Sequence, residues 1–419
     1  MLDCMHECRQ YANESHFPSN DILVRKLFEN LPTIAVIKIL SYLPCEERLE
    51  ISLCCKRWFS LLDCIEVWTV CLIRFCTIGD VKFLTICKRH GHVMKHVKIT
   101  IDQTEHFNRI NSRVCFQILS PKRNKQLRQL VIRCIGHNPL FYKSDKYIDS
   151  LRLLLDNRRI ETELYQFKEG NLPLWANSLR AVDFEGLLVA IPDSLVLTIA
   201  ACHRNIRSIN LLDASLVCCI SNEALVELIS SCPCIENLAI FRKCLSRKAM
   251  LIFACRTTKR KRLKQITLLF RHDEKFSESI DEEMWMEVVK YNPQLQISLI
   301  FDPSCQQHRI ASHILPILPV TRLSIHSTIR STHEIDLASL FYSDTLKELE
   351  LKYEVEWAMS PSPILDTAIR NLVTQSKALE VLRIHCGLSE KTLSIIDSKY
   401  PKLNSHKRTI LCKEINEEI

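Results

Sequence analysis

The sequence predicts an α/β chain in which a small unit of three helices precedes an irregular solenoid of strand–helix repeats. Apolar residues recur at helical spacing between residues 31 and 68, and a ladder of the form apolar-x-x-apolar-x-apolar recurs from residue 94 to residue 384. Short parallel strands are expected on the concave face and helices on the convex face. We expect a flexible extension over residues 1–27, the helical unit over 28–75 and the repeats over 76–419.

Composition removes several classes of function. The 419 residues are 47% apolar and 25% charged, as in ordinary globular proteins. There are only six glycines and no two lie closer than 12 residues, so no glycine-rich loop exists to hold a nucleotide phosphate. The net charge of +8 is mild for this length, which makes nucleic acid an unlikely partner.

The cysteine content and the hydropathy of the sequence indicate in which cellular compartment the protein is expected. The 21 cysteines include no C-x-x-C pair, which is typical of reduced thiols acting as small apolar residues. The first residues lack the basic start and apolar run of a signal peptide, and no apolar stretch reaches the eighteen or so residues that a membrane span needs. We therefore expect a protein of the cytoplasm and/or nucleus with no membrane partner.

The helical unit begins at Leu31-Pro32, where proline tolerates the start of a helix, and apolar spacing continues to Leu43. Pro44 ends this first helix, and the acidic residues that follow it favour a second. Further apolar spacing through Trp58 to Trp68 completes three short helices. About forty residues cannot bury all of this apolar surface internally, so a partner surface is implied.

This unit resembles the F-box, the module that docks F-box proteins on the Skp adaptor of SCF-type (cullin–RING) ubiquitin ligases. The residues that carry the resemblance are Leu31, Pro32, Ile39, Leu40, Tyr42, Leu43, Leu49, Cys54–Trp58 and Trp68. The resemblance implies adaptor contacts at Leu31, Pro32, Ile39, Leu40, Leu43, Cys55, Trp58 and Trp68. The family's usual acidic residue is absent at Thr33-Ile34, and Cys54 replaces valine. A generic three-helix domain is the alternative.

The ladder after residue 94 begins at positions 94, 127, 179, 206, 235, 263, 320, 346 and 379, with a weaker copy at Leu295. A gap near residues 146–171 indicates an insertion or an unreadable unit. Ser221, Ser246 and Ser389 follow the ladders as helix caps, and the chain resembles the cysteine-containing class of leucine-rich repeats. The alternative is a doubly wound α/β domain, although its cofactor loop is missing.

Residues between the ladder positions are expected to face the concave side and to bind a protein substrate. The candidates are Asp183, Glu185, Asn210, Arg322, His326, Glu348, Glu350, Lys352, Arg383 and His385, and the same parity selects Ser208, Asn237, Phe241, Gln265, Thr267 and Ser324. Arg322 and Arg383, flanking the two glutamates, would suit a mixed-charge or phosphorylated segment. A solvated face that binds nothing is the alternative.

Two further clusters are ambiguous. The basic run Arg256, Lys259–Arg262 and Lys264 is either a nuclear import signal or a solvated turn. Cys87, His90, His92 and His96 have spacing that a zinc site would accept, but a surface histidine cluster is favoured, and we expect neither metal nor cofactor.

No catalytic signature occurs, so the chain is not expected to be an enzyme, although a site assembled from distant residues stays open. The resemblance implies a substrate-recognition subunit of an SCF ubiquitin ligase, with Skp, cullin and RING subunits and a protein substrate as partners. An F-box scaffold outside any ligase is the alternative. The sequence identifies neither the substrate, nor a need for its phosphorylation, nor the oligomeric state.

Overall fold

The structure is a computed structural model of the chain. It describes residues 30–53, 56–120, 124, 126–136, 145–156, 179–255, 260–328, 332–353, 362–401 and 408–410. The expected extension over residues 1–27 lies outside these ranges.

The described strands form one parallel sheet of twelve strands that follow each other in chain order. Their bounds are β1 (Val70–Phe75), β2 (His96–Asp102), β3 (Gln129–Ile135), β4 (Ala181–Asp183), β5 (Ser208–Asn210), β6 (Asn237–Phe241), β7 (Gln265–Phe270), β8 (Gln296–Phe301), β9 (Val320–Ser327), β10 (Glu348–Tyr353), β11 (Val381–His385) and β12 (Arg408–Ile410).

Helices alternate with these strands along the chain. The α-helices are α3 (Thr33–Tyr42), α4 (Cys45–Ser52), α5 (Lys56–Leu61), α6 (Lys82–His90), α7 (His106–Ile118), α8 (Asp145–Leu155), α10 (Asp193–Cys202), α11 (Asn222–Ser231), α12 (Arg247–Phe253), α13 (Glu282–Tyr291), α14 (Gln307–Ile310), α15 (His333–Phe341), α16 (Pro363–Gln375) and α17 (Glu390–Lys399). Short 3₁₀ turns are η1 (Ile65–Trp68), η2 (Ile78–Val81), η3 (Gly91–Val93), η4 (Arg242–Cys244), η5 (His272–Phe276) and η6 (Ala311–His313).

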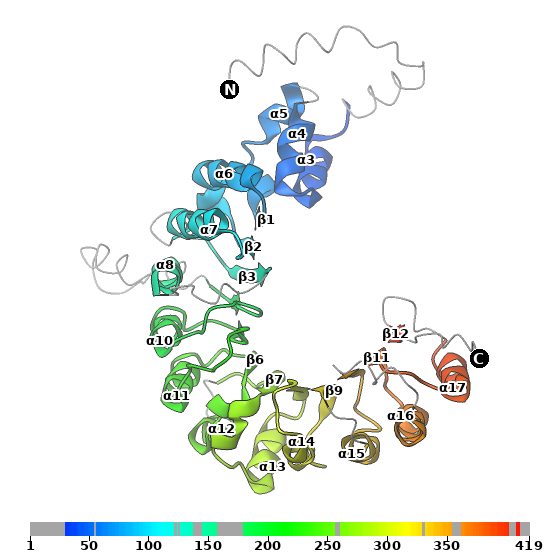
Figure 1. Cartoon of the computed structure of the whole chain (residues 1–419). Coiled ribbons are helices and arrows are strands. Elements are labelled where there is room, and N and C mark those ends of the chain that lie inside the picture. Colours follow the sequence, from blue (N-terminus) through cyan, green and yellow to red (C-terminus); the bar gives the residue numbers. More distant parts are fainter. Residues whose placement is uncertain are drawn as a thin grey trace, which may run out of the picture.

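The strand order distinguishes a solenoid from a doubly wound domain. A doubly wound sheet reverses its strand order at a switch point and carries helices on both faces. Here every strand pairs with the next one in the chain, and Figure 1 shows the strands along the inner side of an arc with the helices outside. The described chain is therefore a leucine-rich-repeat-type solenoid, and the doubly wound alternative is wrong.

Helix starts follow the local signals. The side chains of Ser221, Ser246 and Ser389 each accept a hydrogen bond from the backbone N–H three residues later, as a helix cap does. The helices that follow the first and the last of these serines reach their C-caps at Cys232 and Tyr400, each directly before a proline. The predicted caps are confirmed at these three helices.

Two strands differ from expectation. Residues 70–75 were assigned to the helical unit, but Val70–Phe75 form β1, in which Cys71, Ile73 and Phe75 are buried and the residues between are exposed. The weak copy at Leu295 leads into a full strand, β8, whose pairing with β9 contains a register shift between Ile297 and Ser298. The shift explains the poor fit of this copy, because it disturbs the alternation of inward and outward side chains.

Arg48 joins the helical unit to the first repeat. Although only 2% exposed, its guanidinium donates hydrogen bonds to four backbone carbonyls, and it lies 5.4 Å from the ring of Trp68. The four acceptors are Ser41, Leu43, Val67 and Val70. His90 of α6 stacks on the same indole, with ring centroids 4.2 Å apart. These contacts hold α3, α4, η1 and β1 in one arrangement.

Within the described ranges, no helix has both the length and the hydropathy that crossing a bilayer requires.

Candidate adaptor face and substrate face

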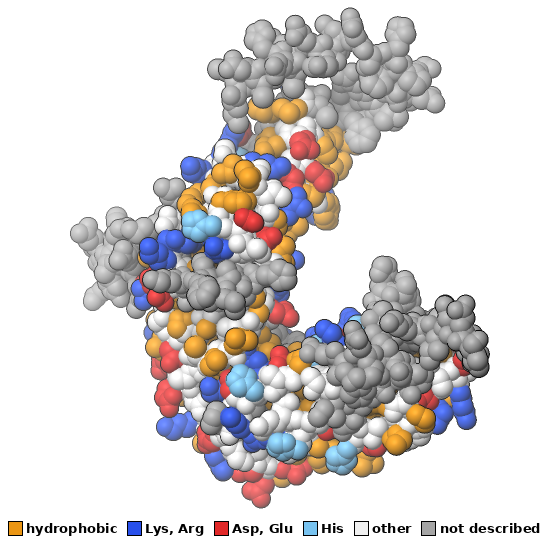
Figure 2. All heavy atoms as spheres, viewed as in Figure 1, with side chains coloured by type: hydrophobic (Ala, Val, Ile, Leu, Met, Phe, Trp, Pro, Cys, Tyr) orange, Lys and Arg blue, Asp and Glu red, His pale blue; other side chains and the backbone are white. Residues whose placement is uncertain are grey.

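The helical unit exposes a set of large apolar side chains. Figure 2 shows orange apolar side chains gathered at the surface near the N-terminal end of the described chain. The exposed fractions are 82% for Ile34, 76% for Tyr42, 64% for Leu53, 50% for Ile65 and 44% for Phe59. We call these five residues the adaptor face. Exposed apolar side chains grouped on one small unit are unusual for a free surface and mark an interaction site.

Helical periodicity explains why this surface stays open. In α3, Val36 and Leu40 lie four residues apart and are fully buried against the rest of the unit. Ile34 and Tyr42 lie on the other side of the same helix, where no described element covers them. The helix is apolar around most of its circumference, but the rest of the unit packs against one side of it only. Apolar side chains on the other side therefore remain in contact with solvent.

The predicted adaptor contacts divide into three groups. Leu40, Trp58 and Trp68 are only 0%, 6% and 0% exposed, so in the free chain they lie behind the face and support it from inside. The indole N–H of Trp68 donates to the carbonyl of Leu62 at 2.6 Å, as expected of a core residue. Direct contact of these three residues with an adaptor stays a prediction.

The remaining predicted contacts are at least partly accessible to a partner, except for one that lies outside the described residues. Leu31, Ile39 and Leu43 are half-buried and Pro32 is exposed, while Cys55 lies outside the described residues. Sequence analysis did not select Ile34, Leu53, Phe59 or Ile65. For Ile34 the helical spacing relative to Val36 and Leu40 was an available signal, because it places this residue away from the buried side of the helix.

The concave face carries two ionic clusters, of which the first spans β3 to β5. Arg133 donates to both carboxylate oxygens of Asp183, at 2.8 and 2.5 Å, and its second terminal nitrogen lies 3.3 Å from Glu185. Asn210 donates to Glu185 at 3.5 Å. The hydrogen bond to Asp183 raises the pKa of Arg133 further, so this cluster is charged and internally paired.

The second cluster is centred on Glu350 of β10. His326 Nε2 lies 3.4 Å from Oε1, Ser324 donates to Oε2 at 3.3 Å, and Arg322 Nη2 lies 3.6 Å from Oε2. Arg322 Nε also lies 3.6 Å from Glu348. The hydrogen bond from His326 and the nearby positive charges lower the pKa of Glu350 to about 2, against the effect of burial.

This pairing changes the expectation for Arg322. It was expected to flank the glutamates as a receptor for a phosphorylated segment, but it already bridges Glu348 and Glu350. Arg383 lies opposite Glu350 in the β10–β11 register, and Lys352 lies opposite His385. Neither Lys352 nor Arg383 makes an ion pair with another described residue, so these two cations of the C-terminal concave face remain available.

The pKa of His385 on β11 is affected by the same charged residues. Burial lowers its pKa, and the charges of Lys352, His326 and Arg383 lower it further, while Glu350 acts in the opposite direction. Lys352, Arg383 and His385 lie on the neighbouring strands β10 and β11, and two of these three side chains are cationic. We call these three residues the basic concave patch.

Most of the concave candidates are half-buried or exposed, unlike the buried ladder positions between them, and two are exceptions. Phe241 is 1% exposed because the chain turns into η4 directly after it and the guanidinium of Arg271 lies 3.9 Å from its ring centroid. Ser324 is also 1% exposed, covered by its hydrogen bonds to His326 and Glu350. Ser208, Asn237 and Thr267 are half-buried and Gln265 is exposed.

The described part of the basic run is folded onto the solenoid. Lys261 and Lys264 lie 2.9 and 2.7 Å from the two carboxylate oxygens of Glu236, and their hydrogen bonds lower its pKa to about 2. Arg260 donates to the carbonyl of Ile229 at 2.7 Å and lies 5.3 Å from the ring of Phe253. Residues 256–259 lie outside the described ranges.

The histidine cluster is dispersed. Cys87 and His90 are buried, whereas His92 is exposed and His96 contacts Gln129 at 3.1 Å. Burial lowers the pKa of His90 to about 4. Among the described residues, no group of three or more histidine, cysteine or acidic side chains is arranged to hold a metal ion. His90 is thus a core residue, and the expected surface cluster is wrong at this position.

Comparison with known proteins finds a family match in the helical unit and relatives that span most of the chain. Residues 28–69 match the family model of the F-box domain. F-box/LRR-repeat protein 8 of Homo sapiens is 21% identical over 387 residues, which cover 90% of this chain and 94% of that protein. The proteins of the same name from Bos taurus and Mus musculus are each 22% identical, over 90% and 91% of this chain and 94% and 95% of theirs.

Proposed function

We propose that this chain, an F-box domain continued by a leucine-rich-repeat solenoid, is the substrate-recognition subunit of an SCF-type ubiquitin ligase. The F-box domain binds the Skp adaptor and, through it, the cullin and RING subunits. The solenoid binds the protein to be ubiquitinated. In this proposal the chain has no catalytic role and accelerates ubiquitin transfer by holding the substrate near the partner's catalyst. The expected compartment, cytoplasm and/or nucleus, stays a prediction.

The observation that carries the proposal is the adaptor face. Five large side chains on a matched F-box domain lie in solvent, although a typical folded unit would cover most of them. The contacts of Arg48, Trp68 and His90 hold this domain against the first repeat. An adaptor bound to the face would therefore present the solenoid in one defined direction.

The adaptor face is tested by Ile34→Asp combined with Leu53→Asp. A charge placed in a desolvated apolar contact should weaken adaptor binding by at least about 2 kcal/mol, roughly thirtyfold. Binding of purified Skp adaptor to the purified chain is measured by calorimetry. Ile364→Asp on α16 is the matched control, because Ile364 is 73% exposed but lies on the solenoid far along the chain.

Retention of full adaptor affinity by the double variant would refute the face as assigned. The alternative function, a scaffold outside any ligase, is separated by the next step of the assembly. If the chain retains the adaptor but neither recruits cullin nor supports ubiquitin conjugation in a reconstituted reaction, the scaffold function is correct and the ligase function is wrong.

For the substrate, we propose the basic concave patch as the contact for an acidic or phosphorylated segment. Arg–carboxylate and Arg–phosphate pairs are strong and directional, and Arg383 is not already committed to a described carboxylate. The variant Lys352→Glu/Arg383→Glu should lose copurifying substrates at least tenfold while keeping the adaptor. The control variant Lys290→Glu/Lys391→Glu makes the same charge change on the convex helices α13 and α17.

Copurifying proteins are quantified by mass spectrometry with each variant expressed at equal level. Equal loss in the test and control variants would show a general charge effect, and unchanged substrate recovery in the test variant would remove the patch from the proposal. Arg322 is unsuitable for this test, because its substitution would also leave Glu348 and Glu350 without their partner.

A further inference from the structure

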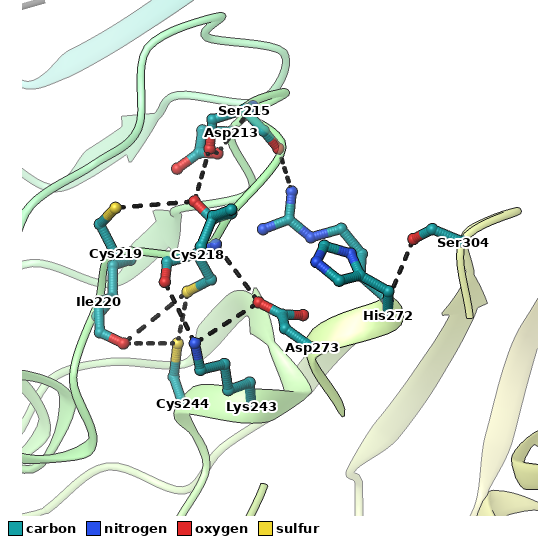
Figure 3. Close-up of polar contacts among 12 residues, drawn as sticks. Asp213, Ser215, Cys218, Cys219, Ile220, Lys243, Cys244, His272, Asp273 and Ser304 are labelled. Atoms are coloured by element: carbon teal, nitrogen blue, oxygen red, sulfur yellow. Dashed lines mark hydrogen bonds and ion pairs between the residues drawn. The ribbon is translucent and has the colours of Figure 1, made fainter. Parts of the chain in front are cut away.

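Two cysteines of consecutive repeats meet at the edge of the solenoid where the parallel strands end. Cys218 lies in the segment after β5, and Cys244 ends the 3₁₀ turn after β6. Their sulfur atoms are 3.2 Å apart, and the residues are 4% and 0% exposed (Figure 3). Both are free thiols in the structure.

The backbone around the pair is held by residues from three repeats. Asp273, after β7, accepts a hydrogen bond from the backbone N–H of Cys218 at 3.4 Å. Lys243 donates to the carbonyl of Cys218 at 3.5 Å and lies 3.7 Å from the carboxylate of Asp273. Figure 3 shows these contacts converging on the segment that carries Cys218. The two sulfurs are thus held together by contacts that do not depend on the thiols themselves.

The thiols are also chemically unequal. The contact with the Cys244 sulfur lowers the pKa of Cys218, with smaller effects in the same direction from the backbone at Ile220 and the charge of Arg271, while burial and the charge of Asp213 act against it. The same contact and burial raise the pKa of Cys244 well above its ordinary value. Cys218 is therefore the member to which we assign the thiolate, while the Cys244 thiol donates to the carbonyl of Ile220 at 3.5 Å.

We propose that Cys218 and Cys244 are an oxidation site at which a hydroperoxide forms a disulfide between two consecutive repeats. With hydrogen peroxide, the Cys218 thiolate attacks one oxygen, an S–O bond forms and the O–O bond breaks. The hydroxide that leaves takes up the proton that Cys218 released on ionising and becomes water. The Cys244 sulfur, losing its proton, then attacks the Cys218 sulfur. The S–S bond forms, the S–O bond breaks, and the second hydroxide leaves as water.

The geometry makes this step short. A disulfide needs sulfurs about 2.05 Å apart, so the present distance must close by only about 1.2 Å. The adjoining residues Leu216 and Val217 are 82% and 50% exposed, so the pair lies directly beneath the surface of the solenoid. A dithiol reductant reverses the reaction by the usual thiol–disulfide exchange.

A second thiol pair provides an internal control. Cys87 and Cys115 have sulfurs 3.7 Å apart and are 1% and 0% exposed. The hydrogen bond with Cys115 and burial raise the pKa of Cys87 well above its ordinary value, and no cationic group is among the causes. This pair shares the proximity of two buried sulfurs but lacks the activation that we assign to Cys218.

The experiment treats the reduced, folded, full-length chain briefly with hydrogen peroxide, alkylates remaining thiols and maps tryptic peptides by mass spectrometry. Cys244 then lies in the peptide 244–247, and Cys218 in the peptide 208–242 together with Cys219, Cys232 and Cys234. We expect a linked pair of these peptides, joined through Cys218 by fragmentation, at least about tenfold more abundant than a Cys87–Cys115 link.

Variants identify which cysteine forms the link, and denaturant tests whether the link needs the folded chain. Cys219→Ser should keep the link, Cys218→Ser should abolish it, and oxidation in urea should remove the preference for this pair. The proposal is overturned by a link through Cys219, Cys232 or Cys234, by equal yield of the Cys87–Cys115 link, or by no link at all. The mapping of the wild-type chain decides the question even if Cys218→Ser fails to fold.

Discussion

At the scale of single residues, many charged side chains on the concave face form ion pairs with one another. Parallel strands place neighbouring side chains about 4.8 Å apart, so Glu350 meets residues of β9 without any loop rearrangement. Arg322, Ser324 and His326 together satisfy its carboxylate. Only the cations outside this cluster, such as Lys352 and Arg383, remain for another protein.

The Glu350 cluster predicts an acid-sensitive contribution to stability. Because the pKa of Glu350 in the folded chain, about 2, lies below its ordinary value of 4.5, the stabilisation is full above pH 4.5 and is lost as the pH falls through 2. Glu350→Gln should therefore lower the free energy of unfolding at pH 7 on the order of 1–3 kcal/mol, with a smaller difference at pH 3.

Urea unfolding followed by circular dichroism at the two pH values measures this difference. Glu380→Gln, at an exposed position just before β11, serves as control and should change stability by less than about 0.5 kcal/mol. A Glu350→Gln variant as stable as the wild type at pH 7 would show that the cluster contributes nothing.

At the scale of elements, the junction between the F-box domain and the first repeat is built around one buried cation. Arg48 from α4 donates to carbonyls at the ends of α3 and around η1 and β1, while its guanidinium and the ring of His90 both lie against Trp68. Carbonyls at helix ends have no partner within their own helix, so a buried donor that reaches several of them is hard to replace.

Arg48→Met should therefore destabilise the F-box domain by more than about 3 kcal/mol, because four carbonyls lose a donor. Arg48→Lys keeps the charge but not the planar fork, and should fall between wild type and Arg48→Met. Thermal unfolding and protease resistance of residues 30–75 are the measurements. Lys88→Met, at an exposed position on α6, is the control, and an equally small effect of Arg48→Met would contradict the role of the junction.

At the scale of the whole molecule, the repeats form an open arc in which each strand contacts only its neighbours (Figure 1). Stability in such an array is approximately a sum over repeats and their interfaces. Histidines shielded from solvent are distributed along it: His90 at the junction and His203 after α10 are buried, and His313 at the end of η6 is half-buried. Burial lowers the pKa of each to about 4.

This distribution predicts loss of stability along the whole arc in mild acid. The folded pKa of each histidine, about 4, lies below its ordinary value of 6.5, so the stabilisation is full above pH 6.5 and is lost as the pH falls through 4. The total is on the order of several kcal/mol. Melting temperatures between pH 7 and pH 4 test this, and a flat profile would exclude it. His203→Gln should reduce the slope.

The sequence by itself determined the order of the elements, most of the strand–helix alternation and the F-box motif. Local signals specify these features: the periodicity of apolar residues, prolines, and serine caps such as Ser221, Ser246 and Ser389. Each cap acts on backbone within one helical turn. Strand parity likewise selected residues that do lie on the concave face, including Lys352 and Arg383.

Only the tertiary structure decided which of these residues meet. It buried Trp58 and Trp68 as supports, left Ile34 and Leu53 open, and joined residues 70–75 to the sheet. It also committed Arg322 to Glu348 and Glu350 and brought Cys218 against Cys244. The physical reason is that a periodic pattern specifies the face of an element, whereas contact depends on the register and packing of another element that is distant in the chain.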